Sequence, residues 1–413
     1  MRYFKGLSWP VCGVLVYTIA PMLTSFMGLS PQLALLLQLP ALAMILAGIL
    51  LSPSKGSKVY ESKGMNFMFM LYMILCFIMY IRGYSLSERN ASLNFNGKMY
   101  IIFGDGLYIL WTLMPLVVKS TFPHFSLKSI VAVGSWICLL FSFLTVFKIP
   151  SLMHNSLMLA AGMTDSANAF QYARVGEIFA PLMLCFAYMN PKRRKMMLFS
   201  YAINILVIIL MARRGALAMS GLLIVFMLLL AYPKMTGIKR TATTMGIILF
   251  VGVFVVFLAD SSIFNYLNSR GLDDTRAGVN ETLLSQMSDW EKVFGMGLNG
   301  KYYMPLRPDE FYDGWRYGCE TGFLNIVLKG GYVMAFVYIF LLLIPAIQGI
   351  FKSNNSFCKG GGLYILWTLI YLYPFGVLNF NLSFFFVWMW VMLCSRREIR
   401  GMSDNEIQEA FFT

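Results

Sequence analysis

The sequence predicts an all-α, polytopic membrane protein, and three observations carry this prediction. Hydrophobic residues make up 58% of the 413 residues and charged residues only 13%, whereas a soluble globular domain has about 25% charged residues. The mean hydropathy is +0.68. The apolar residues are gathered in long runs, and positive charge is concentrated between alternate runs. A soluble fold is therefore excluded.

Each apolar run is about 17 to 22 residues long, which is the length of helix that crosses a hydrocarbon core. We expect about twelve such spans. The first is expected to be retained, because it lacks a small-residue cleavage signature and is too long for a signal-peptide core. In order, the runs begin near Trp9, Pro31, Met65, Ile101, Leu127, Gly176, Met196, Gly215, Thr241, Gly322, Gly362 and Leu382.

Lysine and arginine distinguish the two sides of the membrane. If the basic N-terminus (Arg2, Lys5) is cytoplasmic, the inner segments hold basic clusters with few acids, whereas the outer arginines are accompanied by Asp and Glu. This positive-inside pattern predicts a multi-pass protein with both termini in the cytoplasm. The net charge of +14 then favours anchoring to anionic membrane lipids and not nucleic-acid binding.

Most connections between the runs are short, so we expect one integral membrane domain, residues 1–413. Three outer loops are longer: Arg82 to Tyr100, Lys148 to Val175, and Asp260 to Cys319. The last, residues 260–319, lies between the ninth and tenth expected helices and holds most of the outer charge. Because loops on a rigid scaffold carry function, this large extracytoplasmic loop is the expected functional surface.

Within this loop, Glu281 to Trp290 has apolar residues at the spacing of one helical face: Leu283, Leu284, Met287 and Trp290. We expect one amphipathic helix lying on the bundle, ended by Gly295, Gly297 and Gly300. An aromatic run with interleaved charges follows and includes Trp315, Arg316 and Tyr317. Such rings suit either the interfacial aromatic belt or stacking against sugars.

Arginines at the outer ends of spans are the first candidates for chemistry. Arg213 and Arg214 lie between two apolar runs on the side where positive charge is least expected. Guanidinium groups bind phosphate through paired donors, although snorkelling to lipid phosphate also explains them. Arg276 precedes the amphipathic segment, with a solvated pairing to Asp273 or Asp274 as the alternative. Arg174 is a further candidate, although an ion pair with Glu177 is the simpler explanation of its position.

Glu320 enters the tenth span beside Phe323 and Leu324. Partial burial raises the pKa of a carboxyl group and suits it to general-base work, whereas the helix dipole alone also explains an acid at a helix start. No metal site or cofactor is predicted, because His124 and His154 fall on opposite sides of the expected topology. The seven cysteines are scattered, and no nucleotide-binding motif occurs.

Three blocks of the sequence together resemble the O-antigen ligase and polymerase superfamily, whose members have about a dozen spans and a large late outer loop. They are Arg214-Gly215-Ala216, Arg276 followed by Phe294 to Gly297, and Glu320 through Leu324 to Gly331. The resemblance covers roughly Met196 to Phe351. Ligases have His-Asn-x-x-Leu in the third block, and Glu320 stands in place of that histidine here. The chain is therefore most similar to Wzy-type O-antigen polymerases.

The resemblance implies a metal-independent glycosyltransferase that polymerises undecaprenyl-diphosphate-linked repeat units into O-antigen or capsule-type polysaccharide at the outer face of the bacterial inner membrane. It implies Arg214 and Arg276 as catalytic cations at the diphosphate, Glu320 as the base, and Arg213 and Arg174 as supporting cations. It implies a lipid-linked glycan donor and acceptor as substrates, with a chain-length regulator and a flippase as partners.

Three other functions stay open on the sequence. An O-antigen ligase and a peptidoglycan-type glycosyltransferase use neighbouring chemistry. A lipid-linked oligosaccharide flippase or other transporter would have a polar central cavity and two similar halves. The halves of this sequence show no such similarity, and Asp105 is the main acid within an apolar run.

Overall fold

The structure is a computed structural model. It describes residues 8–27, 29, 31–51, 58–83, 98–121, 127–160, 181–210, 214–231, 236–238, 241, 245, 275–304, 314–319, 321–374, 376 and 378–412. The side chains of some helix residues, among them Arg214 and Arg276, are not described. The chain divides into two compact units, Met1–Ile130 with Thr275–Thr413, and Val131–Asp274.

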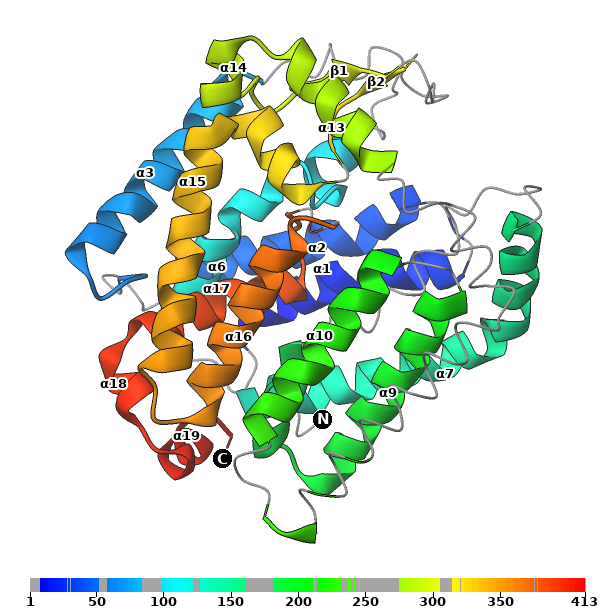
Figure 1. Cartoon of the computed structure of the whole chain (residues 1–413), viewed down its shortest axis with the longest axis vertical. Coiled ribbons are helices and arrows are strands. Elements are labelled where there is room, and N and C mark those ends of the chain that lie inside the picture. Colours follow the sequence, from blue (N-terminus) through cyan, green and yellow to red (C-terminus); the bar gives the residue numbers. More distant parts are fainter. Residues whose placement is uncertain are drawn as a thin grey trace. The chain divides into compact units, whose positions relative to one another are not determined.

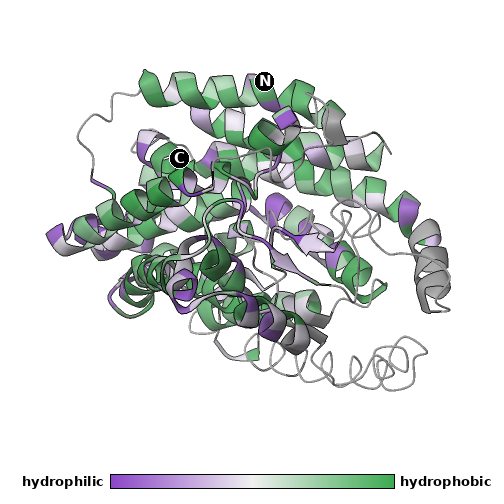
Figure 2. Cartoon of the chain, turned by 90° about the horizontal axis from the view of Figure 1, so that it is seen from above, coloured by the Kyte–Doolittle hydropathy of each residue, from purple (hydrophilic) through white to green (hydrophobic). Residues whose placement is uncertain are grey.

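The described chain is about 80% helical with almost no strands, in line with the predicted all-α class (Figure 1). Hydrophobic residues run along most of the described helices (Figure 2). Within the part of the chain that the structure describes, four segments are long and apolar enough to cross a membrane: Leu33–Leu50, Lys63–Ile81, Leu127–Pro150 and Gly322–Phe351. These segments support the membrane assignment, while the count of twelve spans stays a prediction.

The first unit begins with three helices that start close to the expected positions. They are α1 (Trp9–Phe26), α2 (Pro31–Leu50) and α3 (Lys63–Ile81). The small Gly13 on α1 lets it approach α2 closely, because a Cβ there would lie 2.6 Å from the carbonyl oxygen of Ala41. A glycine therefore sets the spacing of this helix pair.

The prediction of one continuous helix from Ile101 is wrong. A π-helical turn, η2 (Tyr100–Gly104), is followed by a bend, the 3₁₀ turn η3 (Leu110–Leu113) and α6 (Met114–Thr121). Asp105 breaks the run by accepting a hydrogen bond of 2.9 Å from the backbone N–H of Leu107. The freed carbonyls of Phe103 and Gly104 accept from Tyr17 Oη and Gln38 Nε2. Buried side chains thus replace the helical bonds that an apolar environment demands.

The C-terminal part of the first unit contains α15 (Gly322–Phe351), α16 (Ser356–Tyr371), α17 (Leu382–Ser395), α18 (Arg397–Gly401) and α19 (Asp404–Phe412). Helix α17 forms the core, and both Trp388 and Trp390 are fully buried. The ring of Trp388 lies 6.0 Å from that of Tyr72 on α3 and 6.3 Å from that of Tyr338 on α15. Aromatic packing therefore joins α3, α15 and α17.

Helix α15 is sharply bent at Gly331, which has φ 75° and ψ 178° (Figure 1). Only glycine adopts this conformation readily. The bend deprives the carbonyls of Leu328 and Lys329 of their helical donors. They accept instead from the backbone N–H groups of Met296, at 2.8 Å, and Gly297, at 3.0 Å. A segment of the large loop therefore completes the hydrogen bonding of a spanning helix.

The expected single helix over Glu281 to Trp290 is also wrong. The structure has two helices there, α13 (Thr275–Gln286) and α14 (Asp289–Phe294). Ser288 caps α14: its hydroxyl accepts from the N–H of Glu291, whose carboxylate accepts from the N–H of Ser288. Leu283 and Met287 are buried as expected, but Trp290 is 66% exposed. The cap turns the chain, so Trp290 leaves the face it was expected to share.

The rest of the described loop forms a small antiparallel pair, β1 (Tyr302–Tyr303) and β2 (Trp315–Arg316). Tyr302 pairs with Arg316, and Tyr303 pairs with Trp315. Gln286 of α13 bonds both the N–H and the carbonyl of Tyr303, each at 2.7 Å. The pair is thereby attached to α13.

The second unit contains most of α7 (Leu127–Ala160), the 3₁₀ turn η4 (Phe186–Tyr188), α9 (Pro191–Leu210) and α10 (Arg214–Ala231). Tyr201 Oη on α9 donates to the carbonyl of Ser220 on α10 at 3.0 Å. Lys192 lies 5.7 Å from the ring centroid of Trp136 on α7.

Two expectations for the second unit are corrected. The outer loop expected from Lys148 begins later, because α7 continues to Ala160; residues 151–160 are rich in helix-forming Leu, Met and Ala. Over residues 181–190, the span expected from Gly176 is not one continuous helix: residues 181–183 are helical, and a turn and η4 follow before α9 begins. Most of the span expected from Thr241 lies outside the described residues.

Candidate functional pocket

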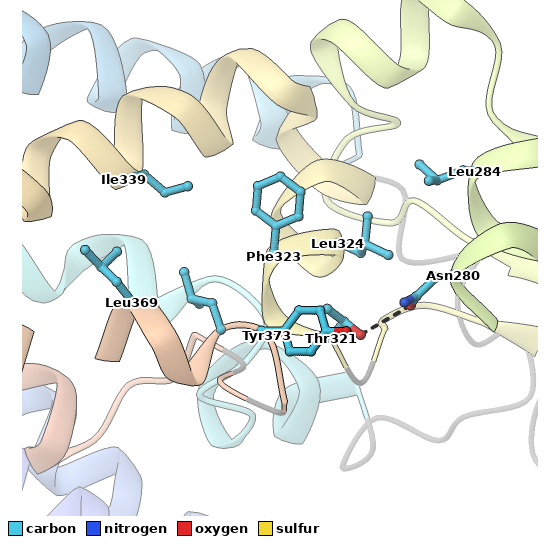
Figure 3. Close-up of a pocket in the computed structure, with 9 residues that line it drawn as sticks. Asn280, Leu284, Thr321, Phe323, Leu324, Ile339, Leu369 and Tyr373 are labelled. Atoms are coloured by element: carbon cyan, nitrogen blue, oxygen red, sulfur yellow. Dashed lines mark hydrogen bonds between the residues drawn. The ribbon is translucent and has the colours of Figure 1, made fainter. Parts of the chain in front are cut away.

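A pocket of about 410 Å³ lies in the first unit between α13, the start of α15 and the end of α16 (Figure 3). Most of its wall is apolar, and an asparagine and a threonine supply the polar end. The lining residues are Asn280, Leu284, Thr321, Phe323, Leu324, Ile339, Leu369, Leu372 and Tyr373. Its volume and its mainly apolar lining with few polar groups fall within the range of small-molecule sites.

The polar end of the pocket is built by side chains from two elements. Thr321 is the N-cap residue of α15, but its hydroxyl makes no cap bond. It donates instead to Asn280 Oδ1 on α13, at 3.2 Å (Figure 3). The thiol of Cys319 contacts the same oxygen at 3.8 Å. Asn280 therefore connects α13 to the start of α15.

The start of α15 is held close to the end of α16. The N–H of Phe323 donates to the carbonyl of Leu372 at 3.1 Å. A Cβ on Gly322 would lie 2.1 Å from the carbonyl oxygen of Gly376. No larger residue fits there without movement of the backbone, so the pocket floor has a fixed geometry.

Two of the three predicted catalytic residues are close in sequence to pocket residues. Arg276 lies in α13 four residues before Asn280. Glu320 lies outside the described residues and directly precedes Thr321. The third, Arg214, is the first residue of α10 in the second unit. Arg213 and Arg174 lie outside the described residues.

The predicted sugar-binding residues differ in exposure. Trp315 is 39% exposed, with the ring of Tyr303 at 5.4 Å and Lys301 Nζ at 4.9 Å from its own ring. Tyr317 is buried. Arg316 is partly buried, and its Nε has no hydrogen-bond partner among the described residues. Trp315 is therefore partly accessible beside Tyr303 and Lys301, whereas Tyr317 is packed in the interior.

A buried polar stripe on α15 was missed from the sequence. Thr321, Asn325 and Lys329 are spaced by four residues, so they share one face of the short first part of α15. All three are at most 6% exposed. Asn325 Oδ1 accepts from the N–H of Cys319 at 3.3 Å. The signal that was available is three polar residues at helical spacing in an otherwise apolar span.

Lys329 is the last residue of this stripe, and it lies near a second set of buried polar side chains, Tyr108 and Asn299. Its Nζ lies 5.8 Å from the ring centroid of Tyr108. The hydroxyl of Tyr108 donates to Asn299 Oδ1 at 2.8 Å, and Tyr108 and Asn299 are both buried. A buried cation at the depth of membrane helices is rare and usually functional. Three segments meet here: the broken element after η2, the loop after α14, and α15.

No metal-binding cluster of His, Cys, Asp or Glu occurs among the residues that the structure describes. No protein-family model matches the chain, and neither a curated protein nor a solved structure matches it. The candidate site therefore stands on its own geometry and on the residues around it.

Proposed function

We propose that this protein polymerises undecaprenyl-diphosphate-linked oligosaccharide repeat units into O-antigen or capsule-type polysaccharide at the outer face of the bacterial inner membrane. The observation that carries the proposal is the pocket between α13 and α15. Its apolar wall suits a prenyl chain. Its polar end is adjacent in sequence to Arg276 and Glu320, which suit the diphosphate and the acceptor hydroxyl.

The proposed reaction is transfer of a glycan from one lipid carrier to the sugar of another. The bond between the donor sugar carbon and the diphosphate oxygen breaks, and undecaprenyl diphosphate leaves with the electron pair. The acceptor hydroxyl oxygen forms the new bond to that carbon, and Glu320 takes its proton. Arg214 and Arg276 stabilise the charge that develops on the diphosphate. Arg213 and Arg174 add positive charge, while Trp315, Arg316 and Tyr317 are assigned to the glycan.

Deletion of the gene in its host distinguishes this function from its rivals. A polymerase deletion leaves surface polysaccharide of one repeat unit. Polymer that is made but not attached indicates a ligase, and repeat units that fail to cross the membrane indicate a flippase. Either of the last two results overturns the proposal.

Turnover of lipid-linked repeat units by the purified protein tests the two residues beside the pocket. Arg276→Lys keeps the charge but loses the paired donors of guanidinium, and Glu320→Gln cannot accept a proton. Both variants should lose most turnover. Glu281→Gln, an exposed acid on α13, is the control and should keep it. Near-normal turnover of Glu320→Gln would remove Glu320 from the mechanism.

Filling the pocket tests the assignment of its apolar wall to the prenyl chain. Ile339→Trp should lower turnover of an undecaprenyl donor by about tenfold, equivalent to about 1.4 kcal/mol, and should affect a donor with a short prenyl chain much less. Phe336→Trp lies on the same helix but is 60% exposed, so it should leave both donors unaffected. Equal losses with the long and the short donor would contradict the assignment.

A further inference from the structure

We propose that α14 lies in the lipid–water interface, with Trp290, Val293 and Phe294 in contact with lipid. The proposal concerns how the large loop is held on the membrane, and it does not depend on the reaction proposed above.

The three residues form one exposed apolar face of α14. They stand at positions i, i+3 and i+4, which share a side of a helix. They are 66%, 39% and 36% exposed, respectively, and the rings of Trp290 and Phe294 lie 4.3 Å apart. No residue of α14 is buried. Packing within the described chain does not explain why α14 exposes a tryptophan and a phenylalanine.

The remaining residues of α14 are polar. Asp289 is fully exposed and forms an ion pair of 3.2 Å with Lys292, and Glu291 completes the capping box with Ser288. The helix therefore has an apolar face and a charged face. This division is typical of helices that lie in a membrane surface.

Hydrogen bonds fix α14 to the ends of two helices that are long enough to span a membrane. Arg82 Nη1, just after α3, donates to the carbonyl of Phe294 at 2.9 Å. The N–H of Leu298 donates to the carbonyl of Met79 at 3.0 Å, and the N–H of Met296 donates to that of Leu328 on α15. Figure 1 shows α14 at the end of the first unit where α3 finishes and α15 bends. This is where spanning helices leave the hydrocarbon core.

Helices α3 and α15 also carry exposed apolar residues below the point where α14 is attached to them. Phe77 and Ile81 on α3 are 62% and 65% exposed, and Phe336 on α15 is 60% exposed. On helices of spanning length and composition, such residues face lipid tails. Because α14 is attached where both helices end, its apolar face reaches the headgroup level, the depth that tryptophan prefers. Lipid is therefore the occupant that the geometry favours over a protein partner.

The test is depth-dependent quenching of a fluorescent label in the full-length protein, reconstituted into vesicles of phosphatidylethanolamine and phosphatidylglycerol. Cys12 is the one half-buried cysteine and the other six are buried, so a Cys12→Ser background limits labelling of native thiols. Bimane is attached to Trp290→Cys, Val293→Cys or Asp289→Cys in separate proteins. Labels at 290 and 293 should emit at shorter wavelengths and be quenched by lipids with a shallow doxyl group. The label at 289 should be quenched by aqueous iodide.

Positions 289 and 290 form a matched pair, because both lie on the first turn of α14 and they differ in the face of the helix that they occupy. Val293→Cys supplies the apolar position independently if Trp290→Cys does not fold. The proposal is overturned if labels at 290 and 293 respond to iodide as the label at 289 does and ignore doxyl lipids. That result would mean that this face meets water and is open to a protein partner.

Discussion

Among the described residues, Lys329 is a buried lysine, whereas a lysine ammonium group is usually exposed to water. It is 4% exposed, and its ammonium group faces the buried ring of Tyr108. A cation over an aromatic ring gains about 0.5 kcal/mol at exposed sites and about 2 kcal/mol when desolvated. Lys301 over the partly exposed Trp315 provides the contrasting case in the same unit.

Lys329→Met should therefore lower the thermal unfolding midpoint of the detergent-purified protein more than Lys301→Met does. Methionine keeps a long apolar side chain and removes only the charge. Lys329→Arg retains a cation and should recover part of the loss. Equal shifts for the two methionine variants would mean that burial adds nothing to the contact at Lys329.

At the scale of elements, the bend of α15 depends on two glycines that face each other. A Cβ on Gly331 would lie 2.1 Å from the carbonyl oxygen of Val293, and a Cβ on Gly295 would lie 2.3 Å from that of Lys329. Both residues have positive φ, 75° and 73°. Neither position accepts a side chain without movement of the backbone.

Gly331→Ala and Gly295→Ala should each destabilise the protein by at least about 1–3 kcal/mol, the usual cost of a non-glycine residue in such a conformation. Gly221→Ala in α10 is the control, because nothing lies within 4 Å of the added Cβ. Alanine there should be neutral or stabilise by about 0.5–1 kcal/mol. Unfolding midpoints measured in one detergent compare the three variants, and a tolerated Gly331→Ala would show that the bend is not rigid.

The last helix, α19, begins with a capping box that responds to pH. The backbone N–H and the hydroxyl of Ser403 both donate to Glu406, each at 2.7 Å, and these bonds lower the pKa of that carboxyl below its ordinary value of 4.5. The folded pKa is the lower one, so the stabilisation is complete above pH 4.5 and is lost as pH falls through the folded value.

The unfolding midpoint of Glu406→Gln should therefore lie below that of the wild type at pH 6, and the gap should narrow as pH falls below 4.5. Glu409→Gln, another exposed acid on α19, is the control. A gap that stays constant down to pH 3.5 would show that the carboxylate charge does not support the cap.

Hydropathy predicted the starts of six helices within one residue, namely α1, α2, α7, α10, α15 and α17, because a long apolar run has few alternatives to a helix in lipid. It did not predict the breaks at Asp105 and Gly331, which depend on donors from α1, α2 and the large loop. The division at Ser288 had a local signal, since Ser288 and Glu291 have capping-box spacing. The pocket could not be foreseen, because it needs the end of α16 beside the start of α15.

At the scale of the molecule, the two ends of the first unit should lie on opposite sides of the membrane. Helices α13 and α14 are at one end of α15, and α18 and α19 are at the other (Figure 1). The distribution of lysine and arginine predicts that α19 is cytoplasmic and the large loop is outside.

A membrane-impermeant thiol reagent checks this orientation in sealed cells with the Cys12→Ser background. Asp289→Cys on α14 should react directly, and Asn405→Cys on α19 should react only after permeabilisation. The parent protein without an added cysteine measures background labelling. The reverse pattern would invert the topology and remove the outer-face reaction with it.

The hydrogen bonds at the bend of α15 also bear on how the protein is made. Residues 296 and 297 are synthesised before α15, but they cannot bond to it until it has emerged and entered the bilayer. Until then, donors for the carbonyls of Leu328 and Lys329 are available only in their own segment, so we expect the nascent span to insert as a straight helix. We therefore expect the bend to form after insertion, when the loop docks and its two N–H groups bond to these carbonyls.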